Sequence, residues 1–383
     1  MASPRLVTAF VALSGLLLAC SPSAPSASAP SAPESPAPEM KPMATNIPLP
    51  AAPGCDLATM PVRDKLAQLL TVGVTGAADA RAVVNNQHVG GIMIGSWTDL
   101  SMLGDGTLAE ISSVGPLPLA VSVDEEGGRV SRLSSLIGVQ PSARELARTH
   151  TPDEVYAIAR DRGQQMRGLG ITVDFAPVVD LTGTSAAIGD RSFGDDPATV
   201  TEYAGAYARG LRDAGVLPVL KHFPGHGRAA GDSHTSSVST PPLDDLMDND
   251  LVPYRTLTTT GPVAVMVGHM QVPGLTGSDP ASLSGAAYQL LRSGGYGGPG
   301  FNGLVYTDDL SSMAAINQRY GVAAAVLRAL QAGADNALWI TTGEVPAVLD
   351  GLEQALNDGA LSQASVDAAL QRNAAAKGGV HCG

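Results

Sequence analysis

The stretch KHFPGHGRAAGDSHTSS, at residues 221–237, gathers reactive side chains in a glycine-rich segment. Three of the chain's seven histidines, His222, His226 and His234, lie there together with Lys221 and Asp232. Such a set suits a metal site, a phosphate-binding loop or a sugar site with a histidine acid/base. The histidine spacing matches neither a helical HExxH pair nor a zinc finger, and the intervening glycines do not hold ligands rigidly. We therefore expect no metal.

A phosphate-binding loop is the second alternative. Backbone N–H groups of a glycine-rich turn bind anions, and Lys221 and Arg228 add positive charge. The fingerprints of nucleotide sites are missing from the sequence, since no GxGxxG follows the first expected strand and no GxxxxGK[ST] occurs. Phosphate binding is therefore kept only as a secondary role of this stretch.

Glycoside hydrolysis is the third alternative. It needs a carboxylate on one face of the sugar, an acid on the other and polar side chains that hold the hydroxyls. The segments SVDEEGG, GDRSFGDDP and YTDDL supply carboxylates, with arginine and lysine nearby as donors. A histidine acid/base is an exception among glycosidases, but an imidazole with a pKa near ~6.5 can donate and take back a proton at physiological pH.

The elements that must position these side chains follow an alternating pattern. Short apolar runs alternate with amphipathic stretches, which is typical of repeated βα units around a parallel sheet. The α/β pattern predicts a single (β/α)₈ TIM-type barrel over residues 54–383, with an open doubly wound sheet as the alternative. The expected strands are QLLTVGV, VGGIMIGS, LPLAVSVD, ITVDFAP, VLPVLKH, VAVMVGHM, NGLVYTD and DNALWIT.

The barrel prediction places the candidate side chains at one rim. Active sites of such barrels lie at the carboxyl ends of the strands. Asp124 ends the third expected strand, Lys221 and His222 the fifth, His269 the sixth and Asp308 the seventh. Long polar segments follow the fourth and fifth strands and are expected at the same rim.

The N-terminal residues predict export. Residues 1–19 combine a short basic leader with an apolar run that is short for a membrane span, and Cys20 after a small residue is typical of a lipoprotein signal peptide. A lipidated Cys20 would anchor the protein to the outer face of the cell membrane; an ordinary secretory signal is the alternative. Residues 20–53, rich in Pro, Ser and Ala, predict a disordered linker.

The net charge and the cysteines limit which partners and which cross-links we expect. The net charge of −13 argues against nucleic acid, whose phosphates favour a basic surface. Beyond Cys20 the chain has Cys55 and Cys382, one at each end of the expected barrel. In an oxidising compartment this pair predicts a disulfide, with two unpaired thiols as the alternative.

Five segments taken together resemble a known family. VDEEGGRVSR, DFAPVVD, RSFGDDP, KHFPGHG followed by DSH, and YTDDL, in this order, resemble glycoside hydrolase family 3. They are most similar to its β-N-acetylhexosaminidase (NagZ-like) branch, and the leader suggests a secreted actinobacterial lipoprotein of that type. The resemblance covers essentially the whole globular part, and the ordered set is far more specific than any one segment.

The resemblance implies a retaining mechanism with a covalent glycosyl-enzyme intermediate. The nucleophile would be Asp308, the general acid/base His234, and Asp232 would orient and polarise His234. Asp309 is the alternative nucleophile, or a helix N-cap. The side chains that the resemblance implies in sugar binding are Asp124, Arg132, Arg191, Lys221 and His222.

The implied function is an exo-acting β-N-acetylglucosaminidase that removes terminal GlcNAc from muropeptide or peptidoglycan fragments in cell-wall turnover. We expect a monomer that needs no cofactor. Phosphorolysis, with phosphate in place of water, and β-glucosidase activity are the enzymatic alternatives. A sugar-binding lipoprotein without turnover is the alternative of another class.

Further side chains are expected to support the site without touching sugar. The acidic pair Glu125 and Glu126 would hold Arg129 or Arg132. Buried hydrogen bonds or local support are the expected roles of the other polar candidates, Asp174, Asp180, His226 and His269. Stacking on a sugar or ordinary packing is expected of the tryptophans that follow the second and eighth strands, Trp97 and Trp339.

Overall fold

The computed structural model of the chain describes residues 57–112, 114–182 and 187–378. The predicted signal peptide at 1–19 and the linker at 20–53 lie outside these ranges, as do Cys20, Cys55 and Cys382. Lipidation and the disulfide therefore stay predictions. Within the described ranges, no helix is both long and apolar enough to cross a membrane.

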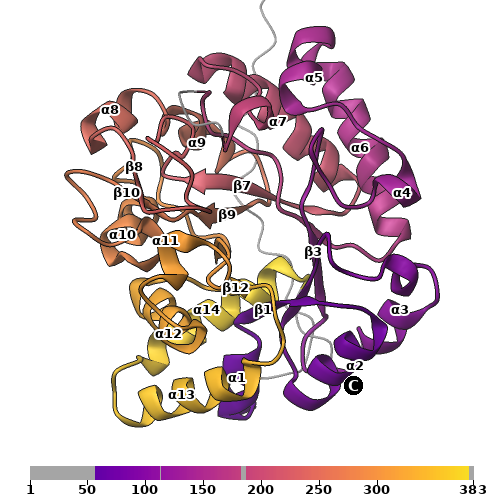
Figure 1. Cartoon of the computed structure of the whole chain (residues 1–383), viewed down its shortest axis with the longest axis vertical. Coiled ribbons are helices and arrows are strands. Elements are labelled where there is room, and N and C mark those ends of the chain that lie inside the picture. The colour runs from indigo at the N-terminus through magenta and orange to yellow at the C-terminus, as the bar shows by residue number, and fades with distance from the viewer. Residues whose placement is uncertain (1–56, 113, 183–186, 379–383) are drawn as a thin grey trace, which may run out of the picture. The chain divides into compact units, whose positions relative to one another are not determined.

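Eight parallel strands form one sheet that curves into a barrel (Figure 1). The first seven strands pair in the order of the chain, the first also pairs with the eighth, and the seventh and eighth meet at an isolated bridge between Tyr306 and Asn336. The ring is closed by hydrogen bonds from Thr307 N to Asn336 O, at 3.0 Å, and from Asn336 N to Val305 O, at 3.1 Å. This confirms the (β/α)₈ prediction, and the doubly wound alternative is wrong. The barrel strands are β1 (Leu70–Val74), β2 (Gly91–Ile94), β3 (Ala120–Val123), β6 (Val173–Asp174), β7 (Leu217–Phe223), β9 (Ala264–Val267), β11 (Val305–Thr307) and β12 (Ala337–Trp339).

Helices connect the strands, and their starts follow from local sequence. The helix over 152–168 begins with a capping box, in which the Thr151 hydroxyl accepts from Glu154 N and the Glu154 carboxylate accepts from Thr151 N. The helix over 197–213 begins where Asp196 accepts from Thr199 N at 2.9 Å. The connecting helices are α2 (Ala77–Gln87), α3 (Thr107–Ile111), α6 (Pro152–Gly168), α7 (Pro197–Asp213), α9 (Val252–Leu257), α10 (Gly285–Ser293), α12 (Val322–Ala332), α13 (Val345–Asn357) and α14 (Gln363–Ala376).

Shorter elements decorate the strand ends. An antiparallel hairpin, β4 with β5, follows β3 directly, and β8 pairs with β10 in a separate two-stranded sheet. None of these short strands was predicted from the sequence. The remaining elements are β4 (Glu125–Gly127), β5 (Val130–Ser131), β8 (Val238–Ser239), β10 (Met270–Gln271), α1 (Val62–Ala67), α4 (Ser134–Ile137), α5 (Ala143–Thr149), α8 (Leu243–Asp248), α11 (Ala314–Asn317), and the 3₁₀ turns η1 (Leu57–Thr59), η2 (Leu100–Leu103), η3 (Gly189–Arg191) and η4 (Ala281–Leu283).

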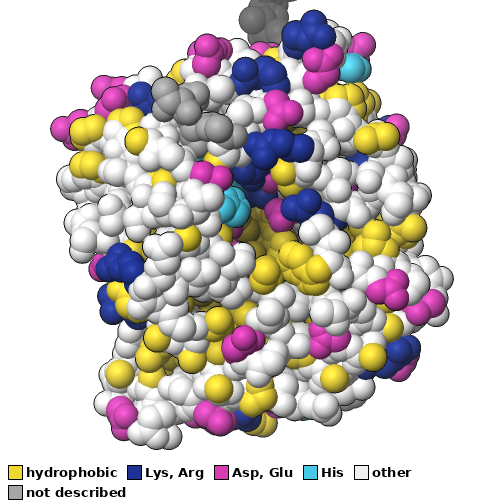
Figure 2. Space-filling model, viewed as in Figure 1, with side chains coloured by type: hydrophobic (Ala, Val, Ile, Leu, Met, Phe, Trp, Pro, Cys, Tyr) yellow, Lys and Arg dark blue, Asp and Glu magenta, His cyan; other side chains and the backbone are white. Residues whose placement is uncertain are grey.

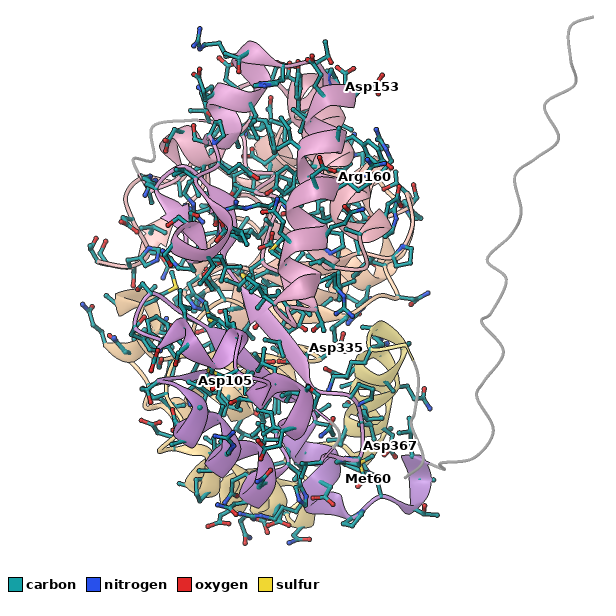
Figure 3. The ribbon with its side chains drawn as sticks, turned by 90° about the vertical axis from the view of Figure 1, so that its right-hand side faces the viewer. Met60, Asp105, Asp153, Arg160, Asp335 and Asp367 are labelled. Carbon is teal, nitrogen blue, oxygen red and sulfur yellow. The ribbon has the colours of Figure 1, made fainter. Side chains whose placement is uncertain are left out.

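The last helix is tied to the barrel through a buried carboxylate. In Figure 3, Asp335 lies beside the C-terminal helix α14, which carries Asp367, while Asp153 and Arg160 mark the long helix α6. One oxygen of Asp335 accepts from Arg372 of α14 at 3.0 Å, and the other accepts from Val305 N at 2.9 Å. This network joins α14 to the first residue of β11.

The alternation of side chains along the strands delivers polar groups to one rim. Successive strand residues point to opposite faces, so every second residue lines the barrel interior. The interior cluster comprises Met93, Ala120, Val173, Phe175, Val219, Ala264, Met266, Leu304, Tyr306 and Leu338. Two residues beyond Val219 on β7 comes Lys221, and two residues beyond Tyr306 comes Asp308. The same face that fills the interior with apolar groups therefore presents an amine and a carboxylate where the strands end.

Candidate active site

A cavity of about 370 Å³ opens at the carboxyl ends of the strands. Figure 2 shows a hollow near the centre of this face, with basic, acidic and histidine side chains around it. All eight residues predicted for catalysis or sugar binding line this one cavity. The lining residues are Asp124, Glu126, Arg129, Val130, Arg132, Ala187, Arg191, Lys221, His222, Asp232, His234 and Asp308.

Asp308 follows β11 directly and faces the cavity. Its backbone N–H donates to Val267 O at 3.0 Å, which continues the ladder to β9. Burial by itself would raise the pKa of Asp308, but the electrostatic interactions with His222, His269 and His234 outweigh burial and hold the pKa well below its usual range. Asp308 is therefore an ionised carboxylate, which is the state that a nucleophile needs.

Asp309, the alternative nucleophile, is engaged in the turn that follows. One of its oxygens accepts from Ser311 N at 2.8 Å and from Ser311 Oγ at 2.7 Å. The other accepts from Ser312 N at 3.1 Å. Asp309 thus caps the turn. Of the two aspartates, Asp308 lines the cavity and Asp309 does not.

The predicted acid/base lies on an exposed loop between β7 and β8. Asp232 Oδ1 accepts from His234 N at 2.9 Å and lies 2.7 Å from His234 Nδ1. Burial would raise the pKa of Asp232, but the hydrogen bonds from the backbone and ring of His234 lower it more. An ionised Asp232 places the imidazole proton on Nδ1 and leaves Nε2 to exchange protons with a substrate.

The two glycines around His226 explain the GHG part of the motif. A Cβ on Gly227 would lie 1.6 Å from Leu181 O, so a side chain there is sterically impossible. Gly225 has a φ of +129°, and a Cβ on it would lie 2.5 Å from Asp250 Cβ. The two glycines let the start of the loop pass close to the Leu181 backbone and to the Asp250 side chain.

A network of charged side chains forms part of the cavity wall. Lys221 Nζ lies 2.7 Å from Asp124 Oδ1 and 2.6 Å from Glu126 Oε1. Glu126 also accepts two hydrogen bonds from Arg191, at 2.7 and 2.8 Å. Burial opposes ionisation of these groups, yet the opposite charges prevail: the pKa of Glu126 is lowered, and those of Lys221 and Arg191 are raised. All of them are charged when a sugar arrives.

The expected partners of the acidic pair were wrong. Glu126 holds Arg191 and Lys221 instead of Arg129 or Arg132. Glu125 forms a buried ion pair with Arg162 of α6, and its contact with Arg132 is to the backbone N–H, at 2.7 Å. The reason is geometric: the β4–β5 hairpin turns the two glutamates to different sides. Within the described residues, the buried Arg132 Nε has no hydrogen-bond partner, although the residue lines the cavity.

Asp180 holds two histidines at once. One of its oxygens lies 2.7 Å from His222 Nδ1, and the other accepts from His226 N at 2.6 Å. The ring of His222 thereby presents its other nitrogen, Nε2, toward the cavity that it lines. Asp174 accepts from Glu125 N at 3.0 Å. Both aspartates organise buried hydrogen bonds, as predicted.

The remaining candidates lie outside the cavity lining. His269 is satisfied by Ser282 Oγ, at 2.6 Å, and by Asp309 O, at 2.7 Å, which agrees with the predicted supporting role. Trp339 is fully buried in the core and packs there, whereas Trp97 is 40% exposed. Among the residues the structure describes, no cluster of three or more metal-ligating side chains occurs.

Replacing Lys221 by methionine is expected to lower the free energy of unfolding by about 3–5 kcal/mol, because the buried Glu126 and the partly buried Asp124 would lose their shared cation. Urea unfolding measures this change. Lys65→Met is the matched control, because its partner Asp367 is 43% exposed and can be hydrated when the amine is removed. An equal loss in both variants would contradict the proposed importance of the buried network.

Asp250 is expected to make stability fall as the pH rises. It lies under the acid/base loop, 2.6 Å from Arg228 Nη2. Burial raises the pKa of Asp250 to about 6, above the value of ~3.9 in an unfolded chain. Between these values the folded protein keeps a proton that the unfolded chain releases. The stabilisation is therefore complete below pH ~4 and is lost as the pH rises through ~6.

Urea unfolding at several pH values tests this expectation. Between pH ~4 and ~7, the wild type should lose up to about 3 kcal/mol relative to Asp250→Asn, since one pKa unit corresponds to about 1.4 kcal/mol. The comparison with the variant cancels the titration of all other groups. Parallel pH profiles of the two proteins would show that Asp250 does not titrate in this way.

Comparison with known proteins places the chain among glycosidases. The family model described as "Glycosyl hydrolase family 3 N terminal domain" matches residues 61–375. The chain is 64% identical to Beta-hexosaminidase LpqI of Mycobacterium tuberculosis over 384 aligned residues, covering 99% of this chain and 98% of that protein. A solved glycosyl hydrolase of the same family from Mycobacterium smegmatis matches with a TM-score of 0.84 and 81% identity, over 85% of this chain and 100% of that one. A β-N-acetylglucosaminidase from Paenibacillus matches with a TM-score of 0.78 and 32% identity, over 83% of this chain and 62% of that one.

Proposed function

The chain belongs to glycoside hydrolase family 3, and from this premise we propose that it is a retaining, exo-acting β-N-acetylglucosaminidase of cell-wall fragments. The coarser statement, that it is a beta-hexosaminidase, follows from the full-length similarity to enzymes of that name. One observation carries the finer proposal: the ionised Asp308 and the His234–Asp232 pair line a single cavity together with the charged wall around Lys221.

The proposed first step is attack of Asp308 on the anomeric carbon. The bond to the leaving oxygen breaks as that oxygen takes the proton from His234 Nε2, and a covalent glycosyl-enzyme forms. Asp232, 2.7 Å from Nδ1, keeps the ring in the required tautomer and stabilises its charged form. In the second step His234 takes a proton from water, which attacks the anomeric carbon and frees Asp308.

The size and charge of the cavity support a terminal sugar as substrate. About 370 Å³ lies at the lower end of the volumes that small-molecule sites occupy, which suits one sugar ring better than an internal stretch of a polymer. Lys221 and Arg191 are paired with carboxylates, so they can donate to hydroxyls without attracting a free anion strongly.

Product analysis tests the mechanism. We expect β-configured GlcNAc as the first product by NMR, and labelling of the peptide that contains Asp308 by a 5-fluoro GlcNAc analogue in mass spectrometry. An α-configured first product would overturn retention. The substrate assignment is tested by comparing aryl GlcNAc with aryl glucoside, and with a GlcNAc-terminated muropeptide. Formation of GlcNAc-1-phosphate in phosphate buffer would favour the phosphorylase alternative.

We further propose that the enzyme acts outside the cell membrane, anchored through Cys20. The support is the sequence of residues 1–19, with its apolar run before the cysteine, and the linker at 20–53. Metabolic labelling with an alkyne fatty acid tests this proposal. Cys20→Ser should abolish the label and release the protein from the membrane fraction, and a label that persists would contradict it.

A further inference from the structure

We propose that His226 and Ser233 are positioning residues for the acid/base: the hydrogen bond between His226 Nε2 and Ser233 Oγ, 2.9 Å long, pins the segment Asp232–His234 over the cavity. The inference rests on the proposed function, because it concerns how His234 is held for proton transfer. Neither residue is a ligand of the substrate, since neither lines the cavity.

Within residues 230–237 of the loop, Ser233 is the one buried residue. Its exposure is 1%, whereas the side chains of its neighbours Asp232 and His234 are 38% and 59% exposed. Thr235 and Ser236, which follow, are exposed as well. An exposed segment holds a catalytic group in place only where it is bonded to the rest of the protein. Ser233, which lies between Asp232 and His234 in the sequence, makes such a bond through its side chain.

His226 supplies a rigid partner for this attachment. Its backbone N–H donates to Asp180 Oδ1 at 2.6 Å, and the other oxygen of Asp180 holds His222. The rings of His222 and His226 lie 5.9 Å apart in an edge-to-face arrangement. The pin is therefore fixed to the same buried carboxylate that orients a sugar-binding histidine.

The direction of the hydrogen bond follows from burial. Burial lowers the pKa of His226 despite the nearby Asp180, so the ring is neutral and carries one N–H. Within the described part of the chain, the buried Nδ1 has no hydrogen-bond partner. An unpaired acceptor is tolerated more often than an unpaired buried N–H. The proton therefore sits on Nε2, and His226 donates to Ser233 Oγ.

The same segment is attached to the nucleophile side of the cavity through its backbone. Ser233 O accepts from Ala315 N and His234 O accepts from Ala314 N, both at 3.2 Å. These two donors begin α11, which follows the turn after Asp308. The side-chain pin and these two bonds hold the segment from opposite sides, and together they set the separation of His234 from Asp308.

The test separates misplacement of the acid from general damage. In Ser233→Ala the imidazole is present but less well placed, and a shift of about 1 Å can reduce a rate about 10²-fold. We expect kcat/KM for aryl GlcNAc substrates with poor leaving groups to fall about 10- to 100-fold, because these need protonation. For 2,4-dinitrophenyl GlcNAc, which leaves without a proton, kcat/KM should change less than about 3-fold. KM for the poor substrates should change little.

Further variants complete the design. His226→Gln keeps an N–H donor and should retain most of the activity, whereas His226→Leu should behave like Ser233→Ala. Ser236→Ala, three residues along the same loop on its exposed side, is the matched control and should leave the dependence on the leaving group unchanged. Thermal unfolding of each variant checks the fold, and Ser233→Cys supplies a second small replacement if the alanine variant is unstable.

The possible outcomes are distinguishable. A dependence on leaving-group pKa that is as shallow in Ser233→Ala as in the wild type would overturn this inference, provided that His234→Ala shows the steep dependence. If His234→Ala also stays shallow, the proposed role of His234 fails, and the proposed function fails with it. Equal losses on good and poor leaving groups in Ser233→Ala would show a general structural role and would also overturn the inference.

Discussion

Replacing Asp308 by alanine is expected to lower kcat by at least about 10⁴-fold, the order seen when an enzyme loses its nucleophile. Without this carboxylate, no covalent intermediate can form, and the developing charge at the anomeric carbon is left without its stabilising partner. The fold should survive, because the Asp308 carboxylate accepts one hydrogen bond, from Asp309 N at 2.9 Å, and the backbone bond from Asp308 N to Val267 O is kept in the alanine variant. Steady-state kinetics with an aryl GlcNAc measures the loss.

Azide provides the diagnostic readout for this variant. In Asp308→Ala, azide can enter the space left by the carboxylate and attack the anomeric carbon once, so the product should be the α-configured glycosyl azide. Asp309→Asn is the comparison variant, because its amide oxygen can still accept from Ser311, only the acceptor of Ser312 N is lost, and the site keeps its nucleophile. Asp309→Asn losing as much activity as Asp308→Ala, or a β-configured azide from the latter, would contradict the assignment.

The pH profile should reflect the same environment. Since histidines hold the pKa of Asp308 well below its usual range, its protonation should not limit kcat/KM above pH ~4, the ordinary value for an aspartate. Removing one of those histidines should move the acidic limb upward. Of the three histidines, His222 lowers the pKa of Asp308 most, so His222→Asn is expected to produce the clearest upward movement, measured as the pH dependence of kcat/KM.

The sequence predicted the barrel because the alternation of apolar runs with amphipathic stretches can be recognised from neighbouring residues alone. Each of the eight apolar runs became a barrel strand in the predicted order, although every strand except β7 is shorter than its run. The β6 strand has two residues, while the predicted run ITVDFAP has seven. The residues after Asp174 leave the sheet and lead to Asp180, whose carboxylate contacts His222 Nδ1. A one-dimensional pattern shows where an apolar run ends but not where its hydrogen bonding to a neighbour ends.

The sequence predicted the site's members better than their partners. Strand ends and the ordered motifs placed eight residues that the structure gathers in one cavity. The partners of Glu125 and Glu126 were wrong, because Arg162 and Arg191 approach from segments 37 and 65 residues away. Only the hairpin geometry decides which cation each carboxylate meets. The hairpin strands, three and two residues long, were too short to be recognised as a strand pair from the sequence.

Replacing His234 by alanine is expected to lower kcat/KM about 10²- to 10⁴-fold for substrates with poor leaving groups, the contribution typical of general acid catalysis. The loss should shrink as the leaving group improves, since 2,4-dinitrophenolate departs without a proton. Turnover of that substrate then becomes limited by breakdown of the glycosyl-enzyme, because the base that activates water is missing. A burst of dinitrophenolate equal to the enzyme concentration should therefore precede a slow steady state.

Azide gives this variant a product opposite to that of Asp308→Ala. A small anion needs no base, so it should attack the accumulated glycosyl-enzyme and accelerate turnover, and two displacements should yield the β-configured glycosyl azide. Asp232→Asn is the graded comparison: the imidazole remains, but its orienting charge is gone, so a smaller loss of the same kind is expected. A loss in His234→Ala that is independent of the leaving group, with no burst and no effect of azide, would remove this histidine from proton transfer. The opposite anomers expected from the two alanine variants assign Asp308 and His234 to opposite faces of the sugar, a distinction that neither rate constant makes by itself.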